Sequence, residues 1–194
     1  MEIDEYEKRL IRRYPSSFVK KVHIDKANKD YILRYRRNDV YAELMIYDTT
    51  DYNPIASIEY ELYKDNCYIG HFITEYDYQG QGLGKYLYQL TQAHAEKNGV
   101  TYSHGIIQPI GDIKGISNNL KPSYESEMKF LMLMYHALGN NIQNVDDDNI
   151  NLWIFTDKWK LGEKSKKLNN EQLEYLDSMI KYDKNLDDNI EQTK

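Results

Sequence analysis

The stretch Tyr78-Gln79-Gly80-Gln81-Gly82-Leu83-Gly84 decides the fold, because it lies between two segments of different periodicity. Residues 67–75 before it follow the turn-forming pair Asp65-Asn66 and predict a strand. Residues 82–98 after it carry leucines at helical spacing and end at a glycine, so they predict a helix. A strand, a glycine-rich loop and a helix therefore follow one another along the chain.

A loop in this position is suited to hold a phosphate group. The N-terminus of a helix presents unpaired backbone N–H groups and the positive end of the helix dipole. The three glycines let this backbone approach an anion without a Cβ in the way. A Walker loop would need glycine at Gln79 and serine or threonine at Tyr86, and a dinucleotide fingerprint would need glycine at Lys85. Neither motif fits, and the remaining structural alternative is a turn that only joins strand to helix.

The pattern that does fit is Gln/Arg-x-x-Gly-x-Gly, satisfied by Gln79, Gly82 and Gly84. With the aromatic residue before it, this loop resembles that of the GNAT superfamily of acyl-CoA-dependent N-acyltransferases. The resemblance implies that the loop binds the pyrophosphate of coenzyme A and that the preceding strand pairs with the pantetheine arm. The cofactor-binding residues that it implies are Phe72, Ile73, Thr74, Gln79, Gly80, Gln81, Gly82, Leu83, Gly84 and Lys85.

A second stretch, residues 134–140, resembles the phrase Leu-Tyr-x-x-x-Gly-Phe that often ends the fourth helix of the family. The resemblance implies that Tyr135 stands beside the coenzyme A sulfur and protonates the leaving thiolate. Two residues depart from the family: Asn140 replaces the usual phenylalanine, and Met128 replaces an asparagine that commonly contacts the pantetheine. The spacing is also longer, because residues 108–122 form an extended loop.

Acyl transfer to an amine also needs a base, because an ammonium group with a pKa near 10.4 has no lone pair. The candidates are Glu75, Glu59 and His71. His71, Ile73 and Glu75 share one strand face, and Glu75 lies nearest the loop. We therefore predict Glu75 as the base beside Tyr135. A chain of water molecules and a purely structural role for His71 are the alternatives.

The remaining periodicity predicts an α/β fold. We expect a GNAT-like central mixed, mostly antiparallel sheet with helices on both faces, plus N-terminal and C-terminal accessory helices. Strands are expected at 31–37, 40–47, 55–63, 67–75, 100–107 and 150–156, and helices at about 3–14, 82–98 and 123–138, with a short one from residue 170. Residues 140–149 predict a polar loop, and His94 is expected to pack on the helix stripe.

The domain organisation follows from a change in composition beyond Gly162. We expect one acyltransferase domain over residues 1–162 and a helical, partly disordered tail over 163–194. Members of the family usually place two helices between their first two strands, but here only a short turn follows residue 37. The N-terminal helix, the 108–122 loop or the tail are the alternatives for building the acceptor site.

Composition excludes several classes of protein and compartment. Cys67 is the only cysteine among 194 residues, so the sequence predicts neither an internal disulfide nor a cysteine-rich metal site, and we expect no metal. No apolar run approaches the roughly 20 residues that span a bilayer, and residues 1–14 lack the apolar region of a signal peptide. These features predict a cytoplasmic protein with no membrane partner.

The net charge of −6 hides an asymmetry. Residues 8–37 hold eleven basic and two acidic side chains, so this segment carries +9 and the remainder carries −15. The basic segment indicates either an anionic partner or merely solvated faces of a helix and strands. The acidic remainder favours a cationic acceptor by electrostatic steering.

These observations predict an N-acetyltransferase that moves an acetyl group from acetyl-CoA to a primary amine by direct attack in a ternary complex. The alternative is a non-catalytic coenzyme A-binding or protein-interaction module on the same fold. The acceptor stays open between a small amine, a polyamine, a protein and an aminoacyl-tRNA. A nucleic-acid partner rests on the basic segment alone, and a homodimer is compatible with the sequence.

Overall fold

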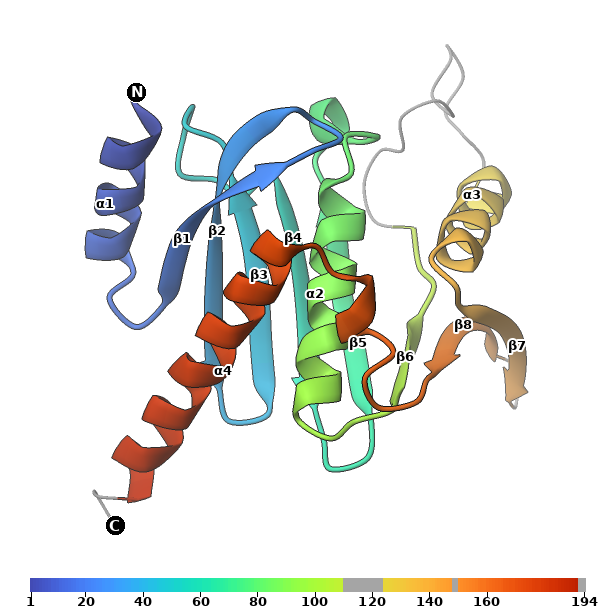
Figure 1. Ribbon diagram of the computed structural model, residues 1–194. Coiled ribbons are helices and arrows are strands. Elements are labelled where there is room, and N and C mark those ends of the chain that lie inside the picture. Colours follow the sequence, from blue (N-terminus) through green and yellow to red (C-terminus); the bar gives the residue numbers. More distant parts are fainter. Residues whose placement is uncertain (110–123, 148–149, 192–194) are drawn as a thin grey trace.

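The computed structural model describes residues 1–109, 124–147 and 150–191 (Figure 1). Within these residues the chain forms one open sheet of eight strands in the order β1-β2-β3-β4-β5-β6-β8-β7. The strands are β1 (Phe18–Ile24), β2 (Lys29–Asn38), β3 (Tyr41–Tyr47), β4 (Ala56–Leu62), β5 (Cys67–Thr74), β6 (Tyr102–Ile106), β7 (Asn141–Asp147) and β8 (Ile150–Lys158). The helices are α1 (Ile3–Arg13), α2 (Leu83–Lys97), α3 (Tyr124–Ala137) and α4 (Asn170–Glu191), with 3-10 turns at Tyr76–Tyr78 and Ser165–Lys167.

Every pair of neighbouring strands is antiparallel except β5 and β6, which are parallel. A parallel pair needs a crossover connection, and α2 supplies it here. This arrangement confirms the expected mixed, mostly antiparallel sheet.

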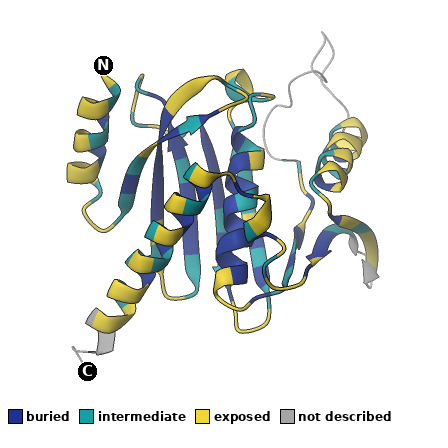
Figure 2. Cartoon of the chain, in the orientation of Figure 1, coloured by how far each residue is buried: buried dark blue, intermediate teal, exposed yellow. Residues whose placement is uncertain are grey.

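Both faces of the sheet are buried over β2 and β3, because successive side chains point to opposite faces. Leu33 belongs to the core that contains Leu87 of α2, whereas Ile32 packs with Tyr6 and Leu10 of α1 in a second cluster. Buried residues concentrate on the strands and along α2, while α1 and α4 each expose one side (Figure 2). Helices therefore cover both faces, as the sequence predicts.

The buried polar centre of the larger core is His94 on α2, which is fully buried. Its Nδ1 lies 2.9 Å from the Tyr60 hydroxyl, and its Nε2 lies 2.7 Å from Oδ2 of Asp183 on α4. Asp183 also accepts a hydrogen bond from the Tyr35 hydroxyl at 2.8 Å and pairs with Arg37 at 3.1 Å. Burial alone would raise the pKa of Asp183, but these partners lower it. His94 is thus a core residue, and its partners come from distant elements.

The C-terminal helix is much longer than the short helix that the sequence predicts. It runs from Asn170 to Glu191 and buries Tyr175, Leu176 and Met179 in the core shared with α2. No helix among the residues placed by the structure is long and apolar enough to cross a bilayer.

Two strands were not expected. β1 lies inside the basic segment, where Lys20 and Lys21 interrupt the apolar pattern, although Val22 and Ile24 are buried. The interpretation of residues 140–149 as a loop is wrong for Asn141–Asp147, which form β7 and pair with β8. β7 lies at the end of the sheet, and a polar sequence suits such an edge strand. The predicted 108–122 loop lies outside the described residues beyond position 109.

Replacing Asp183 with alanine is expected to lower the free energy of unfolding by about 3–5 kcal/mol, because the change leaves His94 and Arg37 without their carboxylate. Urea denaturation at neutral pH measures the effect, and the exposed Asp177→Ala on the same helix is the control. Equal stability of the two variants would contradict this role.

The loss of stability in Asp183→Ala should also depend on pH, and it should become smaller in acid. Because the pKa of Asp183 is lowered in the folded chain, its stabilisation is complete above the unfolded carboxyl pKa of about 3.9. It is lost as the pH falls from there through the lower folded value. The gap between wild type and Asp183→Ala should therefore narrow below about pH 4.

Candidate functional site

The site begins where β5 and β6 separate. The two strands pair in register only at Cys67–Ser103 and Tyr68–His104, although β5 continues to Thr74 along β4. Beyond Tyr68, one edge of β5 therefore lacks a neighbouring strand among the residues that the structure places. Such an edge presents backbone N–H and C=O groups that can bond an extended ligand.

Two local features mark the point where the strands come closest and then separate. The register between β4 and β5 shifts at Gly70, so that Ile69 pairs with Tyr60 and His71 with Glu59. On β6, a Cβ at Gly105 would lie 2.5 Å from the Ile69 carbonyl oxygen, so only glycine lets the strands approach here. The bulge then turns the remainder of β5 away from β6.

The glycine-rich loop connects the end of β5 to α2. Gly80 and Gly82 have φ values of 82° and 90°, which are left-handed conformations that favour glycine. Gly82 is the N-cap of α2, no side chain caps this end, and the Tyr86 N–H bonds the Gly82 carbonyl at 3.0 Å. The N–H groups preceding Tyr86 in the first turn thus have no partner within the helix, and the geometry fits a phosphate.

The predicted loop residues contribute in different ways. Leu83 is 1% exposed, so its side chain packs in the core and only its main chain can meet a ligand. Lys85 is exposed on the first turn of α2. A Cβ at Gly84 would lie 3.1 Å from Cζ of Phe72 and 3.3 Å from Oγ1 of Thr74. Glycine at 84 therefore favours the close packing of α2 on β5, in addition to the role that the sequence predicts for it at the phosphate.

The two glutamines of the loop brace it. The amide of Gln79 donates to the Thr74 carbonyl at 3.0 Å, which folds the loop back on the end of β5. Gln81 donates to the Asp77 carbonyl at 3.1 Å and accepts a hydrogen bond from the Tyr31 hydroxyl of β2 at 3.0 Å. The loop is thus attached both to its own strand and to the N-terminal half of the sheet.

Asp48, a buried residue that the sequence did not single out, makes a further attachment. It accepts hydrogen bonds from the Tyr78 hydroxyl at 3.0 Å and from the Lys29 ammonium at 2.7 Å. Burial would raise the pKa of Asp48, but these donors lower it. Tyr78 directly precedes the loop and Lys29 begins β2, so a buried carboxylate links the two. No local sequence signal could have revealed a contact between residues so far apart.

Four aromatic rings lie beside the free edge of β5. The Phe72 ring lies 5.9 Å from Tyr88 of α2 and 6.3 Å from Tyr135 of α3, measured between ring centroids. The Tyr135 ring stacks on Phe155 of β8 at 4.0 Å and 10°. The structure thus brings Tyr135 to the predicted pantetheine strand. Burial raises the pKa of Tyr135, so the hydroxyl keeps its proton at neutral pH.

Asn140 holds Tyr135 in place, which the sequence comparison recorded only as a departure from the family. Its side-chain N–H donates to the Tyr135 carbonyl at 2.9 Å, and its Oδ1 accepts from the Tyr88 hydroxyl at 2.7 Å. Asn140 is 2% exposed. A buried asparagine therefore ties the end of α3 to α2, a role that phenylalanine could not perform.

The candidate bases lie on the other face of β5. Ile73 and Glu75 alternate with Phe72 and Thr74, and Glu75 is exposed directly after the strand. On the same face as Glu75, Nδ1 of His71 lies 3.7 Å from a carboxylate oxygen of Glu59. The structure therefore groups Tyr135 with Phe72 and Thr74, and it groups Glu75 with the His71–Glu59 pair.

Two other kinds of chemistry, a cysteine nucleophile and a bound metal ion, find little support among the described residues. Burial raises the pKa of Cys67 to about 12, so this thiol is not a nucleophile at neutral pH. Within residues 1–109, 124–147 and 150–191, no three His, Cys, Asp or Glu side chains are grouped to hold a metal ion.

Replacing Asn140 with leucine should lower the free energy of unfolding by about 1–3 kcal/mol, because the Tyr88 hydroxyl loses the Asn140 acceptor and the Tyr135 carbonyl loses one of its donors. Tyr88→Phe removes one of the same hydrogen bonds from the other side. In a double-mutant cycle by urea denaturation, the two changes should couple by more than about 0.5 kcal/mol. Strict additivity would show that the bond between Asn140 and Tyr88 contributes nothing.

Comparisons with known proteins agree with this geometry. The profile of the Acetyltransferase (GNAT) family matches residues 6–105, and no curated protein sequence matches the chain. The cAMP-binding acyltransferase from Mycobacterium smegmatis is similar with a TM-score of 0.55 at 12% identity, over 89% of this chain and 57% of that chain. A mutant of the same enzyme gives 0.56 at 11%, over 93% and 60%.

The PaiA N-acetyltransferase from Thermoplasma acidophilum, in complex with coenzyme A, has a TM-score of 0.45 at 13% identity over 61% of each chain. This chain thus spans about three-fifths of the length of these proteins. At such identities the mycobacterial structures show a shared fold alone. The family profile covers more than half of the chain, including β5, the glycine-rich loop and α2. The chain therefore belongs to the GNAT acetyltransferase family.

Proposed function

We propose that this chain is an N-acyltransferase that moves an acetyl group from acetyl-CoA to a primary amine by direct attack. The observation that carries the proposal is the juxtaposition of an uncapped helix N-terminus behind two left-handed glycines with the free edge of β5 and with Tyr135. The helix N-terminus suits the pyrophosphate of coenzyme A, the edge of β5 suits its extended pantetheine arm, and Tyr135 suits the thioester at the end of that arm.

The chain's own groups divide the binding of acetyl-CoA between them. Backbone N–H groups of residues 80–85 would hold the pyrophosphate, and the backbone of residues 72–74 would pair with the pantetheine arm. The Phe72 and Tyr88 rings would line the thioester end of the arm. Bound acetyl-CoA supplies an activated thioester, and the protein supplies position and proton transfer.

Two proton transfers accompany the attack. Tyr135 would donate a proton to the departing sulfur, and its position beside Phe72 of the predicted pantetheine strand supports the donor role. Glu75 would accept the proton of the attacking amine. The His71–Glu59 pair on the same face is the competing base, because Nδ1 of His71 lies 3.7 Å from a carboxylate oxygen of Glu59 and the two groups could pass a proton on together.

The carboxylates on the face of β4 and β5 opposite α2 support a cationic acceptor. In this chain only the turn at Asp39, with φ of 56°, separates β2 from β3, where the family usually has two helices. The face of β4 and β5 that carries Glu59 and Glu75 is the one opposite α2. Carboxylates there favour the approach of an ammonium group, which becomes nucleophilic after it loses a proton.

Thiol release from acetyl-CoA in the presence of an amine panel tests the proposal. We expect turnover with at least one cationic primary amine, together with direct binding of acetyl-CoA by calorimetry. Binding without turnover on any amine would favour the alternative, a non-catalytic coenzyme A-binding module.

Gly82→Ala should weaken the binding of coenzyme A by about tenfold, because a Cβ at φ of 90° is strained and displaces the backbone that faces the phosphate. Gly99→Ala is the matched control. Gly99 has φ of 83° at the other end of the same helix, with nothing within 4 Å of its missing Cβ. Calorimetry compares the two variants, and equal affinities would contradict the assigned loop.

Tyr135→Phe should reduce turnover by about 10²- to 10⁴-fold, the usual range for general acid–base catalysis. The affinity for acetyl-CoA should change little, because the stacked ring remains. The defect should shrink as the pH falls, since solvent protonates the thiolate more readily below its pKa of about 8.5. Undiminished turnover with a good acceptor would exclude the proposed role.

A further inference from the structure

The turn between β1 and β2 reaches the start of α2 (Figure 1). Lys26 of this turn lies against Gly82 of the glycine-rich loop. A Cβ built at Gly82 would lie 3.0 Å from Cβ of Lys26, 3.3 Å from its Cδ and 3.7 Å from its Cγ. The aliphatic stem of Lys26 therefore runs along the N-cap of α2. The ammonium nitrogen is two bonds beyond Cδ, so it is within reach of the unpaired N–H groups of the loop.

Lys26 also stands apart in the charge pattern of the basic segment. Seven of the eleven basic side chains between residues 8 and 37 form ion pairs, which accounts for most of the local charge. These ion pairs are Arg9–Glu5, Lys20–Glu174, Lys21–Asp4, Lys29–Asp48, Arg34–Glu43, Arg36–Glu43 and Arg37–Asp183. The Lys26 side chain is exposed and has no carboxylate partner among the described residues.

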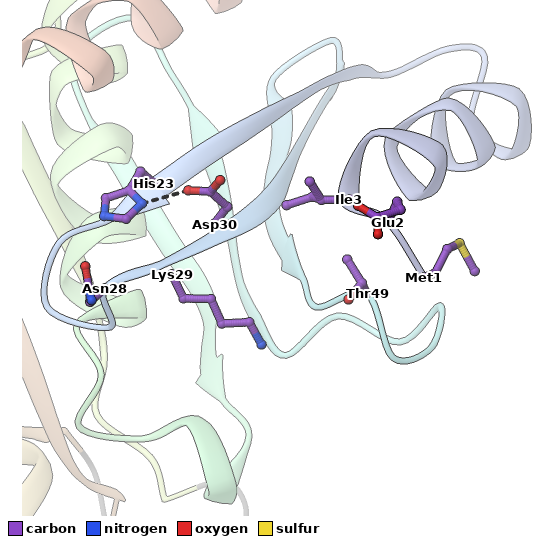
Figure 3. A pocket seen from close by; sticks show the side chains of 8 residues that line it. All are labelled: Met1, Glu2, Ile3, His23, Asn28, Lys29, Asp30 and Thr49. Carbon is purple, nitrogen blue, oxygen red and sulfur yellow. Dashed lines mark hydrogen bonds and ion pairs between the residues drawn. The ribbon is translucent and has the colours of Figure 1, made fainter.

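The turn that carries Lys26 is held in place rather than free. The Ala27 and Asn28 N–H groups bond the carbonyls of Ile24 and Asp25 at 2.9 and 3.0 Å. At the base of the turn, His23 and Asp30 bond at 2.7 Å, and Lys29 extends away from His23 (Figure 3). One side of an open hollow of about 450 Å³ is lined by His23, Asn28, Lys29 and Asp30 of this hairpin.

Two contacts already described join this hairpin to the loop itself. Tyr31 bonds Gln81 inside the loop, and Lys29 shares the Asp48 carboxylate with Tyr78 just before it. The hairpin and the loop therefore form one braced unit, in which Lys26 and Lys85 are exposed lysines without an ion pair to a described residue. Lys26 is the one that the hairpin contributes.

A positive side chain beside the loop would help to balance the charge of a bound pyrophosphate. Its first motif position is the neutral Gln79, whose amide donates to the Thr74 carbonyl. A helix N-terminus contributes only about half an elementary charge, whereas a pyrophosphate carries more than one negative charge. A side-chain cation beside the N-cap would add a charge-assisted hydrogen bond.

We infer that Lys26 is a phosphate-binding residue, contributed by the β1–β2 hairpin, that contacts the pyrophosphate of coenzyme A at the N-terminus of α2. This role rests on the proposed function, because it assumes that the loop holds a coenzyme A thioester. The hairpin thereby becomes part of the binding site and not only a support for the sheet.

Calorimetric binding of coenzyme A and of dephospho-coenzyme A tests the assignment in four chains: wild type, Lys26→Met, Lys26→Arg and Lys21→Met. Methionine keeps an apolar stem beside Gly82. Lys21→Met removes the same charge from the same hairpin, and Lys21 pairs with Asp4 on α1 instead. We expect Lys26→Met to weaken both ligands by about tenfold, with Lys26→Arg retaining affinity and Lys21→Met within about twofold of wild type.

Dephospho-coenzyme A lacks the 3′-phosphate, so equal weakening of both ligands places Lys26 at the pyrophosphate. A loss confined to coenzyme A would overturn the assignment, and so would equal effects of Lys26→Met and Lys21→Met. If wild type binds well and Lys26→Met is unchanged, only this inference fails. If wild type binds neither ligand, the proposed function fails together with it.

Discussion

The packing of the first turn of α2 on the last residues of β5 is the contact on which the rest of the site depends. Gly84 has no Cβ, so the helix can begin directly over Phe72 and Thr74. This close approach aims the unpaired N–H groups of the helix at the end of the strand whose edge β6 has left. The candidate phosphate loop, the extended edge and the aromatic lining consequently share one geometry, which is fixed by the close packing of the α2 backbone on the side chains of Phe72 and Thr74.

The sequence sufficed for features that are encoded locally. The glycine-rich loop, the leucine stripe of α2 and the glycine that ends α3 each depend on neighbours in the chain, and all three lie where the sequence predicts them. The alternation of side chains in β2 to β5 also gave the order of the antiparallel meander. These elements make up the part of the fold that a single sequence specifies most strongly.

The remainder depends on partners that lie far apart in the chain. The apolar pattern of β1 is interrupted by two lysines whose carboxylate partners come from α1 and α4. The strand β7 forms by pairing with β8. Asn140 looks like a departure from a family pattern until Tyr88 and the Tyr135 carbonyl are seen around it. For the same reason, Asp48 and Lys26 join the site only after the hairpin has folded over the loop.

The link between His94 and Asp183 also has a consequence for the order in which the chain can mature. Ribosomes synthesise the chain from its N-terminus, so α2 and the strands around it emerge well before residue 183. Until then, the imidazole at the middle of α2 lacks its carboxylate, and the apolar side of α2 that α4 covers faces water. The part of the chain that carries the candidate site is therefore synthesised well before α4, and its core is complete only after α4 has packed against α2.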